Sequence, residues 1–270
     1  MIEFYLDDVK NFTFNGGEIN VNVSYIEDSD EYTIIANIRN SEDVMKLFML
    51  TNALRKKYNK IERTPLINLY IPYFPYARQD RVCNKGEAFS LEVFVSLLRS
   101  QNYYYITTLD PHSDVLKKIM PEIIIEKPFE NIKKMFLDIG GNEFNLVIPD
   151  KGAIERAKDI INHFIDIKFN VVQFNKNRDL STGKIINMNK LLDNSDDNIP
   201  YILIDDICDG GRTFLEIGKL LNFKNLLEKT YLFVTHGIFS GEWNKLLEYY
   251  DTIYTTDSFY NRKIDRIKVV

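Results

Sequence analysis

The feature that most constrains this chain is a repeated alternation of short apolar runs with longer stretches that have helical spacing. LINLYIP (66–72) and FNVVQF (169–174) are typical of the apolar runs. Strands with this near-continuous apolar composition are buried on both faces, as in parallel sheets covered by helices. The pattern therefore predicts an α/β protein with largely parallel sheets flanked by helices.

The expected elements follow from this reading of the chain. Strands are expected at 18–25, 32–36, 66–72, 103–109, 121–126, 144–149, 169–174, 201–205, 229–236 and 251–256. Helices are expected at 41–58, 89–100, 129–138, 152–164, 213–222 and 241–249. Ser41 is the candidate N-cap of the first helix. Residues 175–198 are polar, contain Gly183, and are expected to form a mobile excursion.

The pattern restarts after Pro128, which predicts two α/β halves, 1–128 and 129–270. A length of 270 residues agrees with this, since domains average roughly 150 residues. No Pro-, Gly- or Ser-rich linker separates the halves, so the expected boundary is a soft one.

Composition excludes several classes of function. The chain has 34 Lys and Arg against 39 Asp and Glu, a net charge of −5, which argues against a general binder of nucleic acid or anionic membranes. It does not argue against a local pocket for small anions. Two cysteines cannot build a disulfide framework, the N-terminus is acidic, and no apolar run approaches the roughly 20 residues of a membrane span. These features predict a soluble protein of the reduced cytoplasm.

The strongest local signal is ILIDDICDGGRT (202–213). Asp205 and Asp206 end an apolar strand, a turn with two glycines follows, and Thr213 opens a helix. Ligands of open α/β sheets bind beyond the C-terminal ends of strands, and a glycine turn at a helix N-terminus offers N–H groups to phosphate. Adjacent carboxylates suit ribose hydroxyls or Mg²⁺. The alternative is an ordinary strand-to-helix turn with solvated acids.

This motif resembles the ribose-phosphate loop of the type I phosphoribosyltransferase fold, and other segments narrow the resemblance to ribose-phosphate pyrophosphokinase. The other segments, in family order, are FNGGEI (14–19), IPYFPYARQDR (71–81), LDPHSD (109–114), IPDKGAIERA (148–157), FNKNRDLSTGK (174–184) and VTHGIFSG (234–241). They run through nearly the whole chain. The resemblance implies two type I phosphoribosyltransferase-like domains.

The resemblance also implies a reaction. The β,γ-diphosphoryl group of MgATP would pass to the 1-hydroxyl of ribose 5-phosphate, giving phosphoribosyl pyrophosphate (PRPP) and AMP. Such transfers depend on positioning, metal ions and cationic stabilisation of spreading charge. The N-terminal half would bind ATP, and the C-terminal half would bind ribose phosphate and carry a flexible catalytic loop.

Site residues are carried over by their place in these segments. The implied ATP contacts are Phe14, Glu18, Arg78, Gln79, Asp80 and Arg81. The implied ribose-phosphate contacts are Asp205, Asp206, Asp209, Gly210, Gly211, Arg212 and Thr213. The implied Mg²⁺ ligands are Asp110, His112 and Asp150, and the implied catalytic residues are Lys176, Arg178 and His112. In this family the adenine loop around Phe14 comes from a neighbouring subunit, so a homo-oligomer is expected. His163 and His236 are interpreted as structural.

Two segments depart from the family pattern. Where the family's sugar-phosphate loop reads Asp-Thr-x-Gly-Thr, this chain has Gly210 and Arg212 in place of the first Thr and the Gly. The loop thereby loses a hydroxyl, gains space and gains a cation. These changes suit a ribose whose 5′-phosphate is joined to a further group, such as ADP-ribose in NAD salvage. The alternative is that ribose 5-phosphate still binds through backbone N–H groups. Gly16 stands where Asp or Asn is usual, which puts base selectivity in doubt. The chain is also expected to lack the family's first strand and helix.

Two further alternatives remain. A phosphoribosyltransferase that consumes PRPP would share the fold, but it would not need both the ATP segment (71–81) and the Lys-x-Arg pair. A non-catalytic regulatory relative would be expected to lose catalytic positions, and Lys176, Arg178, Asp110 and Asp150 are all present.

Overall fold

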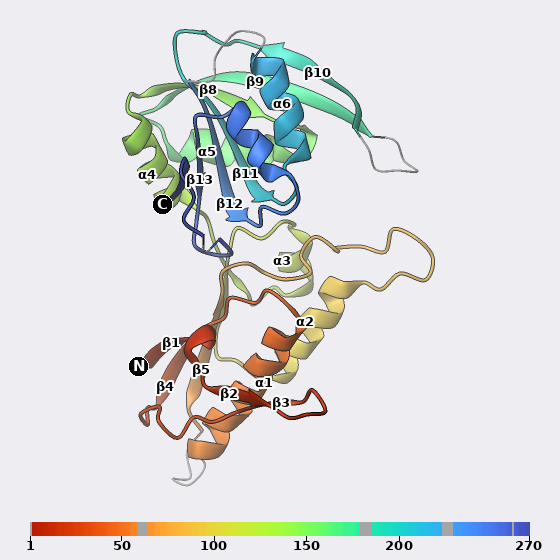
Figure 1. Cartoon of the computed structure of the whole chain (residues 1–270), viewed down its shortest axis with the longest axis vertical. Coiled ribbons are helices and arrows are strands. Elements are labelled where there is room, and N and C mark those ends of the chain that lie inside the picture. The colour runs from red at the N-terminus through yellow and green to blue at the C-terminus, as the bar shows by residue number, and fades with distance from the viewer. Residues whose placement is uncertain (1, 59–63, 179–184, 223–228, 261) are drawn as a thin grey trace. The chain divides into compact units, whose positions relative to one another are not determined.

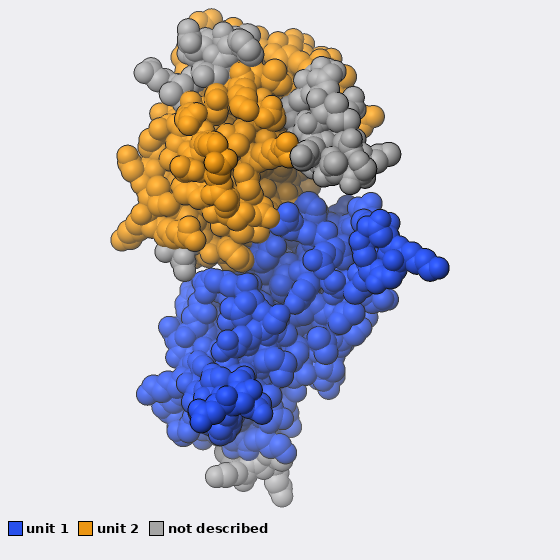
Figure 2. All heavy atoms as spheres, turned by 45° about the vertical axis from the view of Figure 1, so that its right-hand side comes forward, with its two compact units in different colours: residues 1–127 blue, residues 128–270 orange. Residues whose placement is uncertain are grey.

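The computed structural model describes residues 2–58, 64–178, 185–222, 229–260 and 262–270, without the side chains of 58, 176–178, 185–189 and 222. The chain divides into two compact units, Met1–Lys127 and Pro128–Val270, which Figure 2 colours separately. Among the described residues, the helices lack the combination of length and hydropathy that crossing a bilayer requires.

Unit 1 is built on a five-stranded parallel sheet in the order β1-β4-β5-β6-β7. Its strands are β1 (Ile2–Tyr5), β4 (Glu31–Ile35), β5 (Leu66–Ile71), β6 (Ile106–Leu109) and β7 (Ile124–Glu126). A separate antiparallel pair is formed by β2 (Asn11–Thr13) and β3 (Ile19–Val21). The helical elements are η1 (Leu6–Asp8), α1 (Ser41–Tyr58), α2 (Ser90–Ser100) and α3 (Val115–Ile119). Figure 1 shows α1 and α2 beside these strands.

One hydrophobic core joins the sheet of unit 1 to α1 and α2. On β5, Ile67, Leu69 and Ile71 are buried in this core, whereas Asn68 and Tyr70 between them are only partly buried. Side chains alternate between the two faces of a strand, so this unit covers one face of β5 more completely than the other. The expected burial of both faces is therefore only partly met on β5.

Helix α1 spans the predicted residues 41–58, but its N-cap is Asn40 and not Ser41. Asn40 Oδ1 accepts a hydrogen bond from Asp43 N at 3.0 Å, and Asp43 Oδ2 accepts from Asn40 N at 3.2 Å. This reciprocal pair satisfies two N–H groups that the first turn of a helix leaves unpaired.

Unit 2 is built on a seven-stranded sheet in the order β10-β9-β8-β11-β12-β13-β14. Its strands are β8 (Glu143–Ile148), β9 (Lys168–Arg178), β10 (Ile185–Asp193), β11 (Tyr201–Cys208), β12 (Thr230–Gly237), β13 (Thr252–Thr255) and β14 (Ile267–Val269). Only β10 runs antiparallel to its neighbour among the described strands of this sheet. The helical elements are α4 (Phe129–Ile139), η3 (Lys151–Ala153), α5 (Ile154–His163), α6 (Arg212–Asn222) and η5 (Trp243–Glu248).

Hydrophobic clusters cover both faces of the sheet in unit 2. On β11, Leu203 packs in one cluster with residues of α6, and Ile202 and Ile204 pack in another with residues of α4 and α5. A strand buried on both faces needs apolar side chains at successive positions. This is why YILI reads as a continuous apolar run, and here the predicted burial of both faces is confirmed.

Most of the expected polar excursion is a β-hairpin. β9 continues to Arg178, and β10 pairs with it antiparallel from Ile185 to Asp193. The sequence reading placed no strands at these residues, and the structure differs in this respect. β10 lies at the edge of the sheet, where a strand does not need a buried apolar face, so the sequence carried no strand periodicity. The two strands extend as a long arm in Figure 1.

Other boundaries differ from the expectations. The expected strand 18–25 is reduced to β3 and lies outside the parallel sheet, and the expected helix 241–249 is the 3₁₀ helix η5. The N-terminus forms β1 at an edge of the sheet, followed by η1, so the expectation that a first strand is missing is wrong. β14 and α3 were not foreseen, because three- and five-residue elements are too short to show a period.

Candidate functional site

In unit 2, the topology marks where a ligand can bind. The chain leaves β8 for β9 on one side, whereas β11 lies on the other side of β8. The strand order therefore changes direction between β8 and β11. Such a switch point opens a crevice beyond the C-terminal ends of these two strands. Asp150 follows β8, and Asp205 and Asp206 lie on β11, so the carboxylates predicted from the sequence flank this point.

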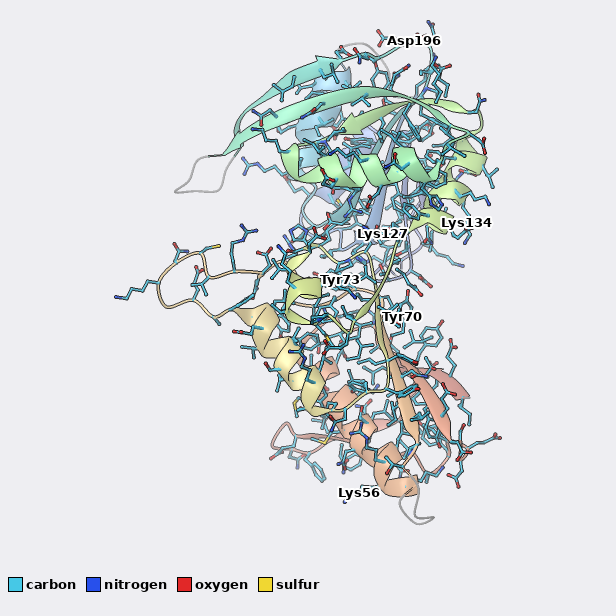
Figure 3. The ribbon with its side chains drawn as sticks, turned by 180° about the vertical axis from the view of Figure 1, so that it is seen from behind. Lys56, Tyr70, Tyr73, Lys127, Lys134 and Asp196 are labelled. Atoms are coloured by element: carbon cyan, nitrogen blue, oxygen red, sulfur yellow. The ribbon has the colours of Figure 1, made fainter. Side chains whose placement is uncertain are left out.

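In unit 1, the predicted ATP segment and the Asp-Pro-His segment line one pocket. These segments follow β5 and β6, which are adjacent and parallel. The pocket has a volume of about 480 Å³. Its lining residues are Arg78, Gln79, Asp80, Arg81, Cys83, Glu87, Ala88, Ser90 and His112. This pocket thus brings together four of the predicted ATP contacts, Arg78 to Arg81, and the predicted catalytic residue His112. The loop between β5 and α2 lies beside α3 in Figures 1 and 3.

Asp80 is the most buried side chain among these ATP contacts, at 9% exposed. Its carboxylate accepts hydrogen bonds from Arg81 Nε at 2.8 Å and from Ser113 Oγ at 2.7 Å. The hydrogen bond from Arg81 is the largest cause that lowers the pKa of Asp80, and burial opposes it. The carboxylate is therefore held ionised between two segments of the pocket.

Aromatic residues of the ATP segment form part of the core. Phe74 is 1% exposed and meets Phe94 of α2 edge-on, with ring centroids 5.3 Å apart. Tyr76 is 37% exposed and has a positive φ of 63°, which is strained for a tyrosine. Strained backbone of this kind occurs where the surrounding structure enforces it, often at functional sites.

Phe14 and Glu18 lie at the turn between β2 and β3 and do not line this pocket. Phe14 is 54% exposed, and its N–H donates to the carbonyl of Glu18 at 2.8 Å. A Cβ atom at Gly16 would lie 2.5 Å from Glu18 Oε2. The Glu18 carboxylate therefore fills the space of a side chain at position 16. This explains how the loop accommodates glycine where the family has Asp or Asn.

Asp205 and Asp206 are close together on β11 and partly or fully buried. Asp206 is 7% exposed, and its N–H donates to Asp205 Oδ1 at 3.0 Å. Burial and the negative charge of Asp206 raise the pKa of Asp205 to about 8. Arg156 on α5, with Nε 3.9 Å from Asp205 Oδ1, opposes this rise. Ionising both carboxylates at once therefore costs free energy, which a bound cation or hydroxyl donors would offset.

An Asp205→Asn variant should change how stability depends on pH. Folding raises the pKa of Asp205 from 3.8 to about 8, so its stabilising contribution is complete below about pH 4 and is lost as the pH rises through about 8. Asparagine does not titrate. Between about pH 5 and 8 this contribution falls by about 1.4 kcal/mol per pH unit. The melting temperature of the variant relative to wild type should therefore rise by roughly 10 °C over this range, at roughly 2–4 °C per kcal/mol, and then stay level.

Thermal melts across this pH range measure the difference. The exposed Asp166→Asn is the matched control for removing one carboxylate from unit 2. A pH-independent difference for Asp205→Asn would contradict the raised pKa.

The two glycines of the turn after β11 differ in whether a side chain could replace them. Gly211 has φ 71°, and a Cβ there would lie 2.9 Å from Leu246 Cδ1, so both conformation and space require glycine. A Cβ at Gly210 would meet nothing within 4 Å. Asp209 is held by Ser240, whose hydroxyl donates to Asp209 Oδ1 and whose N–H donates to the Asp209 carbonyl at 3.1 Å.

A second pocket, of about 380 Å³, adjoins this turn along α6. Arg212 and Gly210 lie at its start, and Thr213 occupies the next position of the helix. The rest of its lining is Leu215, Glu216, Lys219, Glu242, Lys245, Glu248 and Tyr249. Lys219 and Lys245 are paired with Glu216 and Glu242 at 2.9 and 2.7 Å. The pocket is thus polar and close to charge balance.

The predicted Mg²⁺ ligands are divided between the two units. Asp110 is 2% exposed at the end of β6, His112 is exposed, and Asp150 Oδ1 caps its own turn by accepting from Gly152 N at 2.8 Å. Within the described ranges, no three His, Cys, Asp or Glu residues gather to hold a metal. Mg²⁺ bound to nucleotide phosphates needs only one or two carboxylates from the protein. Each unit carries one candidate, Asp110 in unit 1 and Asp150 in unit 2.

The predicted catalytic pair is only partly described. The backbones of Lys176 and Arg178 belong to β9, paired with Met188 and Ile185 of β10, and not to a loop. Their side chains lie outside the described part of the chain. β9 runs parallel to β8, so it ends at the same edge of the sheet as Asp150.

The other histidines have partners. Nδ1 of the buried His236 lies 2.7 Å from Ser258 Oγ, and His163 stacks on Phe129 with centroids 3.8 Å apart. Sequence reasoning missed Ser113, Arg156 and Ser240, although each lies in a segment already singled out. Their roles depend on partners far along the chain, which the sequence did not show.

In comparisons with known proteins, two family models match successive parts of this chain. A family model described as the N-terminal domain of ribose phosphate pyrophosphokinase matches residues 1–101. A second, described as a phosphoribosyl transferase domain, matches residues 121–245.

Relatives align with this chain over most of its length. A ribose-phosphate pyrophosphokinase of Thermococcus kodakarensis is 28% identical over 265 residues, 95% of this chain and 87% of the relative. One of Pyrococcus furiosus is 28% identical over 245 residues, 87% of this chain and 81% of the relative. The crystal structure of a phosphoribosylpyrophosphate synthetase from Mycobacterium smegmatis matches with a TM-score of 0.68 at 18% identity, covering 97% of this chain and 85% of that one.

The last comparison confirms the fold of two parallel-sheet domains, and the two family models match successive parts of one chain. This protein therefore belongs to the ribose-phosphate pyrophosphokinase family, as a distant member that retains both domains.

Proposed function

We propose that this protein transfers the β,γ-diphosphoryl group of MgATP to the 1-hydroxyl of ribose 5-phosphate, giving PRPP and AMP. The observation that carries the proposal is the pocket of unit 1, in which the ATP segment and the Asp-Pro-His segment converge. A phosphoribosyltransferase that consumes PRPP would need only a sugar-phosphate loop like that of unit 2. The separate pocket of unit 1, which Arg78 and Arg81 line, favours a reaction with a nucleotide as donor.

Unit 1 would bind MgATP through its arginines. Arg78 and Arg81 can each donate two parallel hydrogen bonds to phosphate oxygens, and Gln79 can donate one more. Phe14, at 54% exposed, offers an aromatic face for adenine, and the family likeness suggests that it serves a neighbouring subunit of a homo-oligomer.

Unit 2 would hold the sugar. The carboxylates of Asp205 and Asp206 can accept hydrogen bonds from the ribose hydroxyls, and the N–H groups at the start of α6 can donate to the 5-phosphate. The bond from the sugar O1 to the β-phosphorus forms while the bond from that phosphorus to the α,β-bridging oxygen breaks. AMP leaves, and the hydroxyl proton passes to solvent.

Charge stabilisation would complete the mechanism. Lys176 and Arg178 would face the transferring phosphoryl oxygens, where a cation is most effective once water is excluded. When bound with ATP, Mg²⁺ would neutralise phosphate charge and help to orient the phosphates. We place the reaction in the reduced cytoplasm, because both cysteines, Cys83 and Cys208, are free thiols.

The pocket beside Arg212 favours a second candidate, the same transfer to ADP-ribose, giving ADP-ribose 1-pyrophosphate. A ribose whose 5′-phosphate carries a further phosphate and nucleoside needs space beyond the phosphate loop. The pocket of about 380 Å³ begins at Gly210 and Arg212, where the family usually has Thr and Gly. Arg212 could bind the second phosphate and Tyr249 could contact the nucleoside.

The test is AMP formation from MgATP with ribose 5-phosphate or ADP-ribose as the acceptor. AMP with ribose 5-phosphate is the expected result, AMP only with ADP-ribose would establish the second candidate instead, and AMP with neither would overturn both. A Gly210→Thr variant sharpens the choice. The open space at Gly210 admits the side chain, whose hydroxyl suits a terminal phosphate and whose bulk narrows the pocket. Its ratio of kcat/KM values should shift toward ribose 5-phosphate by about tenfold.

A further inference from the structure

Ser113 connects the two segments that line the pocket of unit 1. It follows His112 directly, and its hydroxyl donates to Asp80 Oδ2 at 2.7 Å. Asp80 belongs to the ATP segment and is 9% exposed. Its carboxylate also accepts from Arg81 Nε at 2.8 Å and Nη2 at 3.2 Å. A single buried carboxylate thus joins residues that follow two neighbouring strands.

The two partners of Asp80 differ in how firmly they are held. The Arg81 side chain is 73% exposed, so it cannot fix the direction of the carboxylate by itself. Ser113 is partly buried, and its backbone carbonyl accepts from Leu116 N at 3.3 Å in α3. The firmer partner is therefore Ser113. It orients Asp80, and Asp80 in turn orients the guanidinium of Arg81.

We propose that Ser113 is a positioning residue of the ATP site: through Asp80 it fixes how Arg81 faces the pocket that Arg78 and His112 also line. The inference rests on the proposed function, because it concerns how unit 1 binds MgATP. Ser113 makes no bond to the nucleotide in this proposal. Its loss should therefore weaken nucleotide binding and leave the chemical step nearly unchanged.

Ser113 also has a structural role that the test must separate. Its Oγ accepts from Val115 N at 3.2 Å, which supports the start of α3. A Ser113→Asp variant keeps an acceptor for Val115 but cannot donate to Asp80, and it adds a second negative charge there. A Ser113→Thr variant keeps the hydroxyl and both hydrogen bonds.

Initial rates of AMP formation against MgATP, at a saturating concentration of the accepted sugar, test the proposal. Ser113→Ala should raise KM for MgATP about tenfold and change kcat by less than about twofold, as expected for one lost hydrogen bond to a charged group. Ser113→Thr should stay within about twofold of wild type, and Ser113→Asp should be at least as impaired as Ser113→Ala. Melting temperatures of all three show whether they fold.

The outcomes are distinct. A normal KM in folded Ser113→Ala, or a KM that Ser113→Asp restores, would overturn the positioning role and leave Ser113 with its hydrogen bond to Val115 N before α3. If wild type makes no AMP with either sugar but binds MgATP in calorimetry, the proposed function fails. The ratio of the binding constants of wild type and Ser113→Ala then tests Ser113. A wild-type chain that binds no MgATP would overturn both.

Discussion

Replacing Lys176 with alanine should lower kcat for AMP formation by about 10³-fold, the effect of removing a cation that stabilises a phosphoryl-transfer transition state. Lys176 belongs to the segment that resembles the Lys-x-Arg pair of the family, and its backbone lies near the end of β9. The charge on the phosphoryl oxygens spreads only during the transfer. The loss should therefore appear in kcat, with a smaller change in KM for either substrate.

Lys168→Ala is the matched control for this prediction. Lys168 begins the same strand, its side chain is 70% exposed, and its Nζ lies 2.6 Å from Glu143 Oε1. An exposed ion pair of this kind contributes about 0–1 kcal/mol, so activity should be unchanged. Both variants should melt within a few °C of wild type. If Lys176→Ala keeps kcat within about tenfold, Lys176 does not belong to the catalytic machinery.

Replacing Arg78 with alanine should raise KM for MgATP about 100-fold. Arg78 lines the pocket of unit 1 with Gln79, Arg81 and His112. A charged, bidentate hydrogen bond to phosphate is worth about twice a neutral one, and its removal leaves a phosphate charge without its partner. The nucleotide is bound in both the ground state and the transition state, so we expect the main change in KM.

Two further variants make the Arg78 prediction specific. Arg78→Lys keeps the charge but loses the fork of donors, so its KM should lie between wild type and alanine. Arg99→Ala on α2 removes an arginine of the same unit that is 47% exposed and pairs with Glu122 at 2.8 Å. Its KM should be that of wild type. Equal effects of Arg78→Ala and Arg99→Ala would mean that the pocket does not bind the phosphates.

The fold was largely predictable because its strands are buried. Ile202, Leu203 and Ile204 pack in clusters on both faces of one sheet, and continuous apolar runs of this kind identify buried strands. The hairpin of β9 and β10 was missed for the opposite reason. It extends to the edge of the sheet, where polar side chains remain solvated and strand pairing leaves no periodic signal.

The candidate site was predictable in its segments but not in its contacts. The sequence singled out Asp80, Asp205 and Asp209, which stand in short motifs at the ends of strands. It did not show that Ser113 holds Asp80, that Arg156 faces Asp205, or that Ser240 holds Asp209. Each of these partners lies on a different element, and its position depends on how neighbouring strands and helices pack.

By itself, the sequence determined the α/β class and the family, and it predicted the segments that we propose to carry the chemistry. Burial requires apolar strands, and phosphate and ribose chemistry requires particular residues at short spacing, so both leave local patterns. Only the tertiary structure decided which segments share the pocket of unit 1 and where space opens beside the glycine turn of unit 2. The ATP segment and the Asp-Pro-His segment meet around Asp80, and space opens beside Gly210. These features depend on strand order and on backbone geometry at the ends of strands, which no local pattern specifies.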